Sequence, residues 1–120
     1  MKWGTFYGIV NAEWLDDGRS MKLNMPVTFI DHRHCRWIAP AGSVIDGASI
    51  PRFFWRFIGG PFSGRYRRAS VIHDVYCVTR SMPSPRVHAM FYAAMRADGV
   101  GAFKAGLMWL AVRLFGPRWR

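Results

Sequence analysis

Apolar and polar positions follow different periods in the two halves of the chain. The front half favours short strands, which we expect at residues 6–10, 21–30, 36–39 and 43–45. The clearest signal is in residues 21–30, where every second residue from Leu23 to Phe29 is apolar, as in a half-buried strand. Turns are expected at residues 16–18 and 31–34. The front half therefore predicts a small antiparallel β-meander.

The back half has the period of helices, which we expect at residues 50–58, at 66–80, from Pro85 to Gly99 and at 102–115. Residues 66–80 are apolar almost all round, which is typical of a buried helix. Ser84 is expected to cap the next helix, with Pro85 at its first position. The apolar stripe of that helix has the spacing i, i+3, i+4, i+7 and i+8, and consists of Val87, Met90, Phe91, Ala94 and Met95.

These patterns predict an α+β fold in which three or four C-terminal helices pack on the N-terminal meander. A chain of 120 residues can bury one sizeable core, and no linker divides it, so we expect residues 1–120 to form a single domain. The two cysteines are too few for a disulfide framework and fit a reduced compartment. The sequence shows neither a signal peptide nor an apolar run long enough to be a transmembrane segment.

Basic residues are concentrated in the back half of the chain. Residues 1–50 hold five basic and five acidic side chains, whereas residues 51–120 hold twelve basic and two acidic ones. The arginines expected to form a binding surface are Arg52, Arg56, Arg65, Arg67 and Arg68. We expect weak, non-specific contact with nucleic acid. Sequence-specific recognition is not expected, because no recognition helix, zinc finger or ribonucleoprotein signature accompanies the charge.

Two motifs concentrate the polar groups that could do chemistry. The first is Asp46-Gly-Ala-Ser-Ile-Pro-Arg52, and the second is His73-Asp-Val-Tyr76. Together with the aromatic run between them, these motifs resemble the phage and prophage domain of unknown function 1353, over roughly residues 40–115. The resemblance implies a phage context and no established activity.

The side chains of Asp46, Ser49, His73 and Asp74 form the candidate site. One hypothesis is catalysis by Ser49 as nucleophile and His73 as base, with an aspartate as orienting acid. Another is a metal held by His73, Asp74 and Asp46. However, adjacent helical residues point about 100° apart and cannot easily face one ion. The third is a buried hydrogen-bonded network in which Ser49 caps a helix, Arg52 pairs with Asp74 and His73 holds a loop carbonyl.

We favour the structural network, and we expect neither a cofactor nor a bound metal. A zinc site formed by His32, His34, Cys35 and Cys77 is a weaker hypothesis, because no C-x-x-C pair accompanies them. The last helix, residues 102–115, is apolar over too much of its circumference for a membrane-surface helix. It therefore predicts a core or subunit contact.

The function that we expect is docking by a phage-encoded accessory protein. Its partners would be virion proteins, and it would be a minor component of the tail or adsorption apparatus. It would reside in the host cytoplasm during infection and afterwards in the virion. The alternative is a small phage hydrolase, acting on peptidoglycan through the Asp46, Ser49, His73 and Asp74 cluster.

Overall fold

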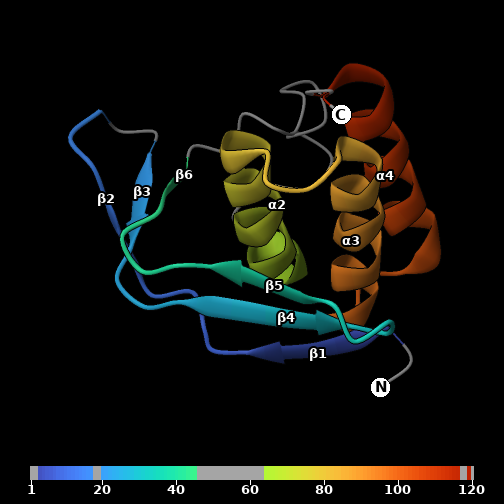
Figure 1. The fold of residues 1–120 in the computed structure, drawn as a ribbon, viewed down its shortest axis with the longest axis horizontal. Coiled ribbons are helices and arrows are strands. Elements are labelled where there is room, and N and C mark those ends of the chain that lie inside the picture. Colours follow the sequence, from blue (N-terminus) through green and yellow to red (C-terminus); the bar gives the residue numbers. More distant parts are fainter. Residues whose placement is uncertain (1–2, 18–19, 46–63, 117–118, 120) are drawn as a thin grey trace.

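The computed structural model describes residues 3–17, 20–45, 64–116 and 119, which form an α+β fold (Figure 1). The strands are β1 (Gly4–Tyr7), β2 (Ala12–Trp14), β3 (Met21–Leu23), β4 (Val27–Asp31), β5 (Arg36–Ala39) and β6 (Val44–Ile45). The helices are the 3-10 turn η2 (Gly64–Tyr66), α2 (Arg67–Thr79), α3 (Ser84–Ala97) and α4 (Ala102–Phe115). The predicted class, antiparallel strands followed by packed helices, is confirmed. The helix expected at residues 50–58 lies outside the described residues.

The strands are divided between two antiparallel sheets, with the orders β1-β4-β5 and β2-β3-β6. The single strand expected at residues 21–30 is therefore wrong, because it is two strands that belong to different sheets. The break comes just before Val27, where Pro26 lacks an N–H to donate to a ladder. The alternation of apolar residues continues across the break, which is why the pattern alone did not show it.

The first strand also lies earlier than its pattern suggests. It spans Gly4–Tyr7 instead of residues 6–10, and it pairs with β4 from Gly4 opposite Asp31 to Tyr7 opposite Thr28. The strand ends at Gly8, whose φ of +93° is open to glycine and strained for other residues. Ile9 and Val10 were expected in the strand but lie beyond this turn.

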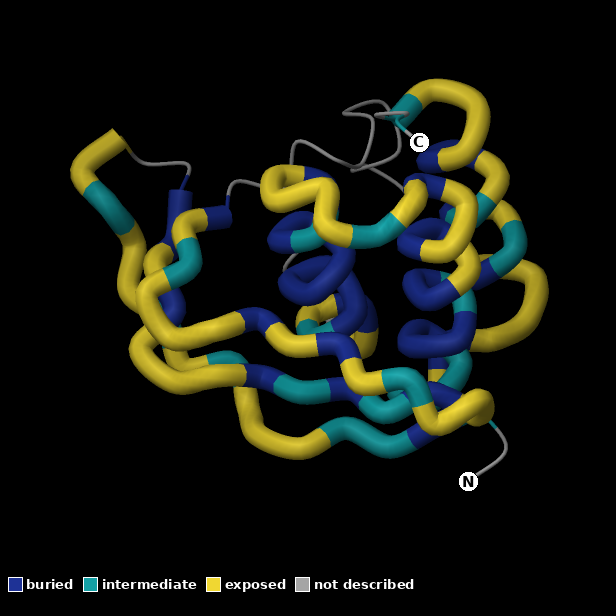
Figure 2. The backbone as a smooth tube through the Cα atoms, viewed as in Figure 1, coloured by how far each residue is buried: buried dark blue, intermediate teal, exposed yellow. Residues whose placement is uncertain are grey.

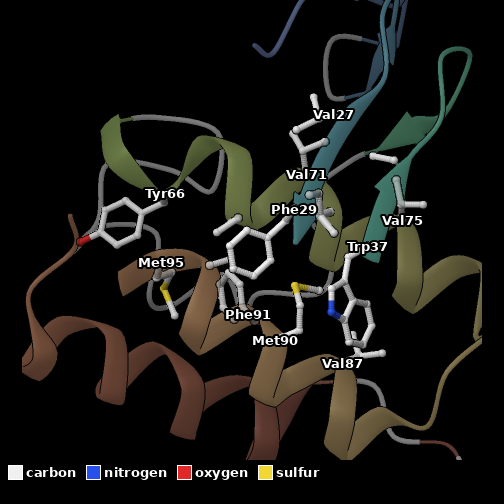
Figure 3. Packing of buried hydrophobic residues seen from close by; sticks show 14 of the residues in the cluster. Val27, Phe29, Trp37, Tyr66, Val71, Val75, Val87, Met90, Phe91 and Met95 are labelled. Carbon is white, nitrogen blue, oxygen red and sulfur yellow. The ribbon is translucent and has the colours of Figure 1, made fainter. Parts of the chain in front are cut away.

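Helices α2 and α3 pack side by side over the β1-β4-β5 sheet, and α3 lies between α2 and α4 (Figure 1). The core fills the space between this sheet and the two inner helices. Phe29 and Trp37 of the strands meet Phe91 and Met90 of α3 there (Figure 3). The predicted stripe of α3 is buried throughout, so its helical spacing correctly identified the face that meets the sheet.

Asp31 closes the turn between β4 and β5 and is almost fully buried. Its carboxylate accepts hydrogen bonds from Trp37 Nε1 at 2.9 Å and from the backbone N–H groups of Arg33 and Cys35 at 2.8 and 3.0 Å. Burial acts to raise the pKa of Asp31, but these three hydrogen bonds and the nearby His32 outweigh it and lower the pKa below 3.8. The expected turn after β4 is thus held by an ionised aspartate.

The start of α3 differs from the prediction. The helix begins at Ser84, with Pro83 in the cap position, and no side chain caps it. The Ser84 hydroxyl instead donates to the backbone oxygen of Trp119 at 2.6 Å and accepts from the Trp119 N–H at 3.1 Å. Ser84 therefore ties Trp119 to the start of α3, and the expected role as a cap is wrong.

Candidate functional site

A pair of buried histidines joins the two inner helices. His73 of α2 and His88 of α3 are 0% and 3% exposed. Their ring nitrogens, Nε2 of His73 and Nδ1 of His88, lie 2.9 Å apart. The His73 ring also stacks on Phe91, with centroids 4.4 Å apart. Apolar packing therefore fixes the orientation of the pair from one side.

The environment keeps His73 neutral. Complete burial, and secondarily the proximity of His88, lower the pKa of His73 well below 6.5. A neutral imidazole donates at one ring nitrogen and accepts at the other, so one proton lies between Nε2 of His73 and Nδ1 of His88 across the 2.9 Å contact. Cys77, one turn further along α2, places its sulfur 3.8 Å from the His73 ring nitrogens. The buried His73 ring therefore has hydrogen-bonding partners inside the protein.

The second motif also links the helical layer to the sheet. Tyr76 of α2 accepts a hydrogen bond at its hydroxyl from the Ile38 N–H of β5, at 2.9 Å. Its ring meets Trp37 edge to face, with centroids 5.0 Å apart. Asp74 is 2% exposed and makes interactions of its own. His73 thus joins α2 to α3, and Tyr76 joins α2 to the sheet.

Asp46, Ser49 and Arg52 of the first motif lie outside the described residues, as does Arg56 of the predicted binding surface. The triad, the metal set and the Arg52 pairing with Asp74 therefore stay predictions. The predicted bond from His73 to a loop carbonyl also stays a prediction, and the contact that the described residues show is with His88.

His88 was missed by the sequence analysis. It stands next to Val87 on the buried face of α3, three residues before Phe91, so a polar ring inside an apolar stripe was the available signal. Its partner His73 lies fifteen residues away in the sequence, and only the packing of α2 against α3 brings the rings together.

A shallow pocket of about 230 Å³ opens beside this pair. It is lined by Ser84, Pro85, His88, Arg113 and Leu114. His88 thus lies between the buried His73 and the pocket. The Arg113 side chain lies over the Trp109 ring, 5.1 Å from its centroid, which brings a cation to the pocket rim.

The zinc hypothesis gains no geometric support in the part of the chain that the structure describes. There, no group of three or more His, Cys, Asp or Glu side chains is arranged to hold a metal ion. Cys77 faces His73 in the helical layer, whereas Cys35 lies near the Arg86 guanidinium, 3.8 Å from its Nη2. The two thiols therefore have different neighbours, and both are free cysteines.

The described arginines of the predicted binding surface are partly engaged within the molecule. Arg68 pairs with Asp98 through a two-pronged contact, donates to the Gly8 carbonyl and lies over the Phe6 ring. Arg65 donates to the Gly99 carbonyl at 3.2 Å. Arg67 is exposed at the start of α2 and also makes an interaction of its own. Arg65 and Arg68 thus contribute to the junction between α2 and the end of α3.

The outer face of α4 is apolar and exposed. Its buried face, Ala105, Met108, Ala111 and Val112, packs toward α3. On the opposite face, Phe103, Leu107, Leu110 and Leu114 are between 41% and 82% exposed, and we refer to these four residues as the α4 stripe. Figure 2 shows exposed chain along this outer side of α4. None of the helices in the described ranges is long and apolar enough to span a bilayer.

Comparisons with known proteins match this chain to proteins of unknown function. A family profile described as "Protein of unknown function (DUF1353)" matches residues 21–112. The chain is 44% identical to the uncharacterized protein y4jT of Sinorhizobium fredii over 97% of its own length and 35% of the relative's. It is 40% identical to the uncharacterized protein y4iH of the same bacterium, over 94% of its length and 46% of the relative's. It thus spans less than half of either relative. No solved structure matches it.

Proposed function

This chain belongs to the DUF1353 family of proteins of unknown function, and we propose that it acts by docking to another protein through the outer face of α4. The exposed α4 stripe carries this proposal. A helix that is apolar all round is ordinarily buried on all sides. In α4, however, Phe103 is 82% exposed and Leu110 is 44% exposed. Large apolar side chains gathered on one exposed face are typical of a protein interaction surface.

The described polar groups support docking over chemistry. His73 is fully buried and neutral, and it shares a hydrogen bond with His88 while stacking on Phe91. A general base must reach the proton that it abstracts. The side chain that the hydrolase hypothesis needs as its base is therefore occupied inside the core.

Given the phage context that the resemblance implies, we propose a virion protein as the partner and a minor tail or adsorption component as the role. Before assembly, the protein would reside in the host cytoplasm. The basic back half would add weak, salt-sensitive contact with nucleic acid, because phosphate attraction is non-specific and screened. A partner held by the apolar stripe would instead stay bound at high salt, since burial of apolar area does not depend on charge.

The test is capture of partners from a lysate of infected host cells, washed at low and at high salt. The wild-type protein is compared with a double variant, Leu107→Asp and Leu110→Asp, and with Phe103→Asp as an independent change on the same face. Val78→Asp is the matched control, because Val78 is also apolar, helical and 71% exposed, but lies on α2.

We expect one virion protein to be retained by the wild type and by Val78→Asp at both salt concentrations, and to be lost from both stripe variants. Melting temperatures should match the wild type, since these sites are exposed. The same retained proteins for all four chains would refute docking through α4. Retention of DNA alone at high salt would also refute it.

A further inference from the structure

We infer that the α4 stripe binds an acidic amphipathic helix of the partner, with a seam of apolar residues flanked by Asp or Glu. This inference rests on the proposed docking function and specifies the chemistry of the partner. Three features of α4 lead to it: the spacing of the stripe, a glycine beside it and the charge on both its sides.

The spacing of the stripe is that of a helix-pairing seam. Phe103, Leu107, Leu110 and Leu114 follow one another at steps of four, three and four residues. At about 100° per residue, they fall within about 60° of arc, which is the narrow seam of paired helices. They extend about 16 Å along the axis, or three turns, at 1.5 Å per residue. A ligand that covers this surface must be extended and apolar along one line, as the apolar face of a helix is.

Gly106 lies on the exposed side of α4, next to this seam. A glycine in a helix interior costs about 1 kcal/mol relative to alanine. Here no neighbour requires it, because a Cβ atom at Gly106 would meet no described heavy atom within 4 Å. Its position is three residues after Phe103 and four before Leu110, so it leaves a gap beside the seam. A small residue at that place lets the backbone of a second helix approach closely.

The charged residues that flank the stripe are all basic. Lys104 lies on one side and Arg113 on the other, and α4 contains no acidic residue. Within residues 64–116, the two acids are Asp74, which is buried, and Asp98, which is paired with Arg68. Arg113 is held over Trp109 and lines the pocket together with Leu114. A carboxylate on the flank of a bound helix can therefore reach Arg113 where the seam ends.

This charge distribution favours an acidic partner over a second copy of the chain. Two copies paired through α4 would bring Lys104 and Arg113 of both chains together without any acid on either helix. Each chain also carries a net charge of +10, which opposes self-association.

The experiment uses two synthetic helical peptides, each about three heptads long, with the same leucine seam. One has Glu at all flanking positions and the other has Lys. Each carries a fluorescent label and is titrated with the full chain, with binding measured by anisotropy. The tested chains are the wild type, Leu110→Asp, Val78→Asp as the exposed control, and the double reversal Lys104→Glu with Arg113→Glu.

The wild type and Val78→Asp should bind the Glu peptide about tenfold more tightly than the Lys peptide, which is the effect of two exposed ion pairs. The double reversal should invert this preference, and Leu110→Asp should bind neither peptide. Equal affinity for both peptides, or no binding of the Glu peptide, would overturn the inference. If capture from lysate still depends on the stripe in that case, the proposed docking function stands and only the partner's chemistry is wrong.

Two further outcomes would show that the α4 stripe binds something other than an acidic helix. Sedimentation of the chain alone as a dimer that Leu110→Asp converts to a monomer would assign the stripe to a second copy. Stripe-dependent flotation of the chain with vesicles of phosphatidylglycerol would assign it to a lipid surface. Either result would overturn the inference of an acidic helix.

Discussion

The interior of the helical layer and the outer face of α4 differ in where they place polar and apolar side chains. The interior buries polar rings, whereas the outer face exposes apolar side chains. Between α2 and α3, two buried imidazoles are hydrogen-bonded to each other, and that of His73 stacks on Phe91. On α4, leucine and phenylalanine side chains, which gain most from burial, are exposed. Large apolar side chains that gather on an exposed face are typical of an interaction surface, which is why we propose docking through α4.

This difference indicates what each region contributes. The histidine pair links two helices and makes their packing specific, because a buried polar pair is stable only in the arrangement that satisfies both partners. The α4 stripe leaves much of its apolar area exposed in the isolated chain, and that area is available as binding energy for a second protein. We therefore expect changes in the first region to alter stability and changes in the second to alter binding.

The largest expected effect on stability is that of Phe91→Ala. Phe91 is fully buried and supports the His73 ring, so its removal should lower the free energy of unfolding by about 3–5 kcal/mol. Phe103→Ala is the matched change on the α4 stripe and should stay within about 0.5 kcal/mol of the wild type. Urea titration of both variants checks this. Similar losses for the two phenylalanines would mean that the outer face of α4 is part of the core.

The next effect is the dependence of stability on pH below 6.5. The pKa of His73 is lowered in the folded protein, so this group takes up a proton more readily when the chain is unfolded. Its contribution to stability is complete above 6.5, and it is lost as the pH falls from there toward the lowered pKa of the folded state. The slope should approach, at most, about 1.4 kcal/mol per pH unit.

His73→Gln should flatten this slope when urea unfolding is repeated at a series of pH values. His34→Asn is the control, because it removes an exposed histidine at a residue with φ of +64°, a conformation that asparagine tolerates. The lowered pKa of Asp31 acts in a separate window, since its contribution is complete above 3.8 and is lost only as the pH falls below that value. An unchanged slope in His73→Gln would contradict the assignment of a buried neutral imidazole.

The smallest expected effect on stability has the opposite sign. Gly106→Ala should raise the free energy of unfolding by up to about 1 kcal/mol, because alanine is the better helix former and the site has room for its methyl group. The same change should weaken capture of the partner, since the methyl group fills the gap beside the seam. Thermal unfolding and capture from lysate measure the two quantities separately. A stabilised variant that captures its partner as well as the wild type would remove Gly106 from the interface.

The helices were more predictable from sequence than the strands, for a physical reason. The range of α4 and the buried face of α3 follow from a local period of 3.6 residues, which does not depend on distant contacts. The division of residues 21–30 between two sheets depends on which strands pair, and Leu23 and Val27 fit the same alternation in either case. Strand pairing joins residues far apart in the sequence, so a local pattern leaves it open.

The candidate site was predictable only in part. His73 and Asp74 were expected to be buried and to need partners, and both are buried. The identity of the partner His88 depends on the register of α2 against α3, which no spacing in the sequence encodes. Ser84 illustrates the same limit, because its hydroxyl meets Trp119, thirty-five residues away, and not the start of its own helix.

The most direct test of docking through α4 compares leucine methyl signals in one NMR titration. The protein is labelled at its leucine methyl groups and its histidine rings, and the captured partner is added stepwise. The leucines are Leu15, Leu23, Leu107, Leu110 and Leu114, of which Leu23 is buried in the core and serves as an internal reference. We predict that the signals of Leu107 and Leu110 shift or broaden, while those of Leu23 and of the His73 and His88 rings stay in place. Shifts of the histidine ring signals with unchanged Leu107 and Leu110 methyls would contradict docking through α4.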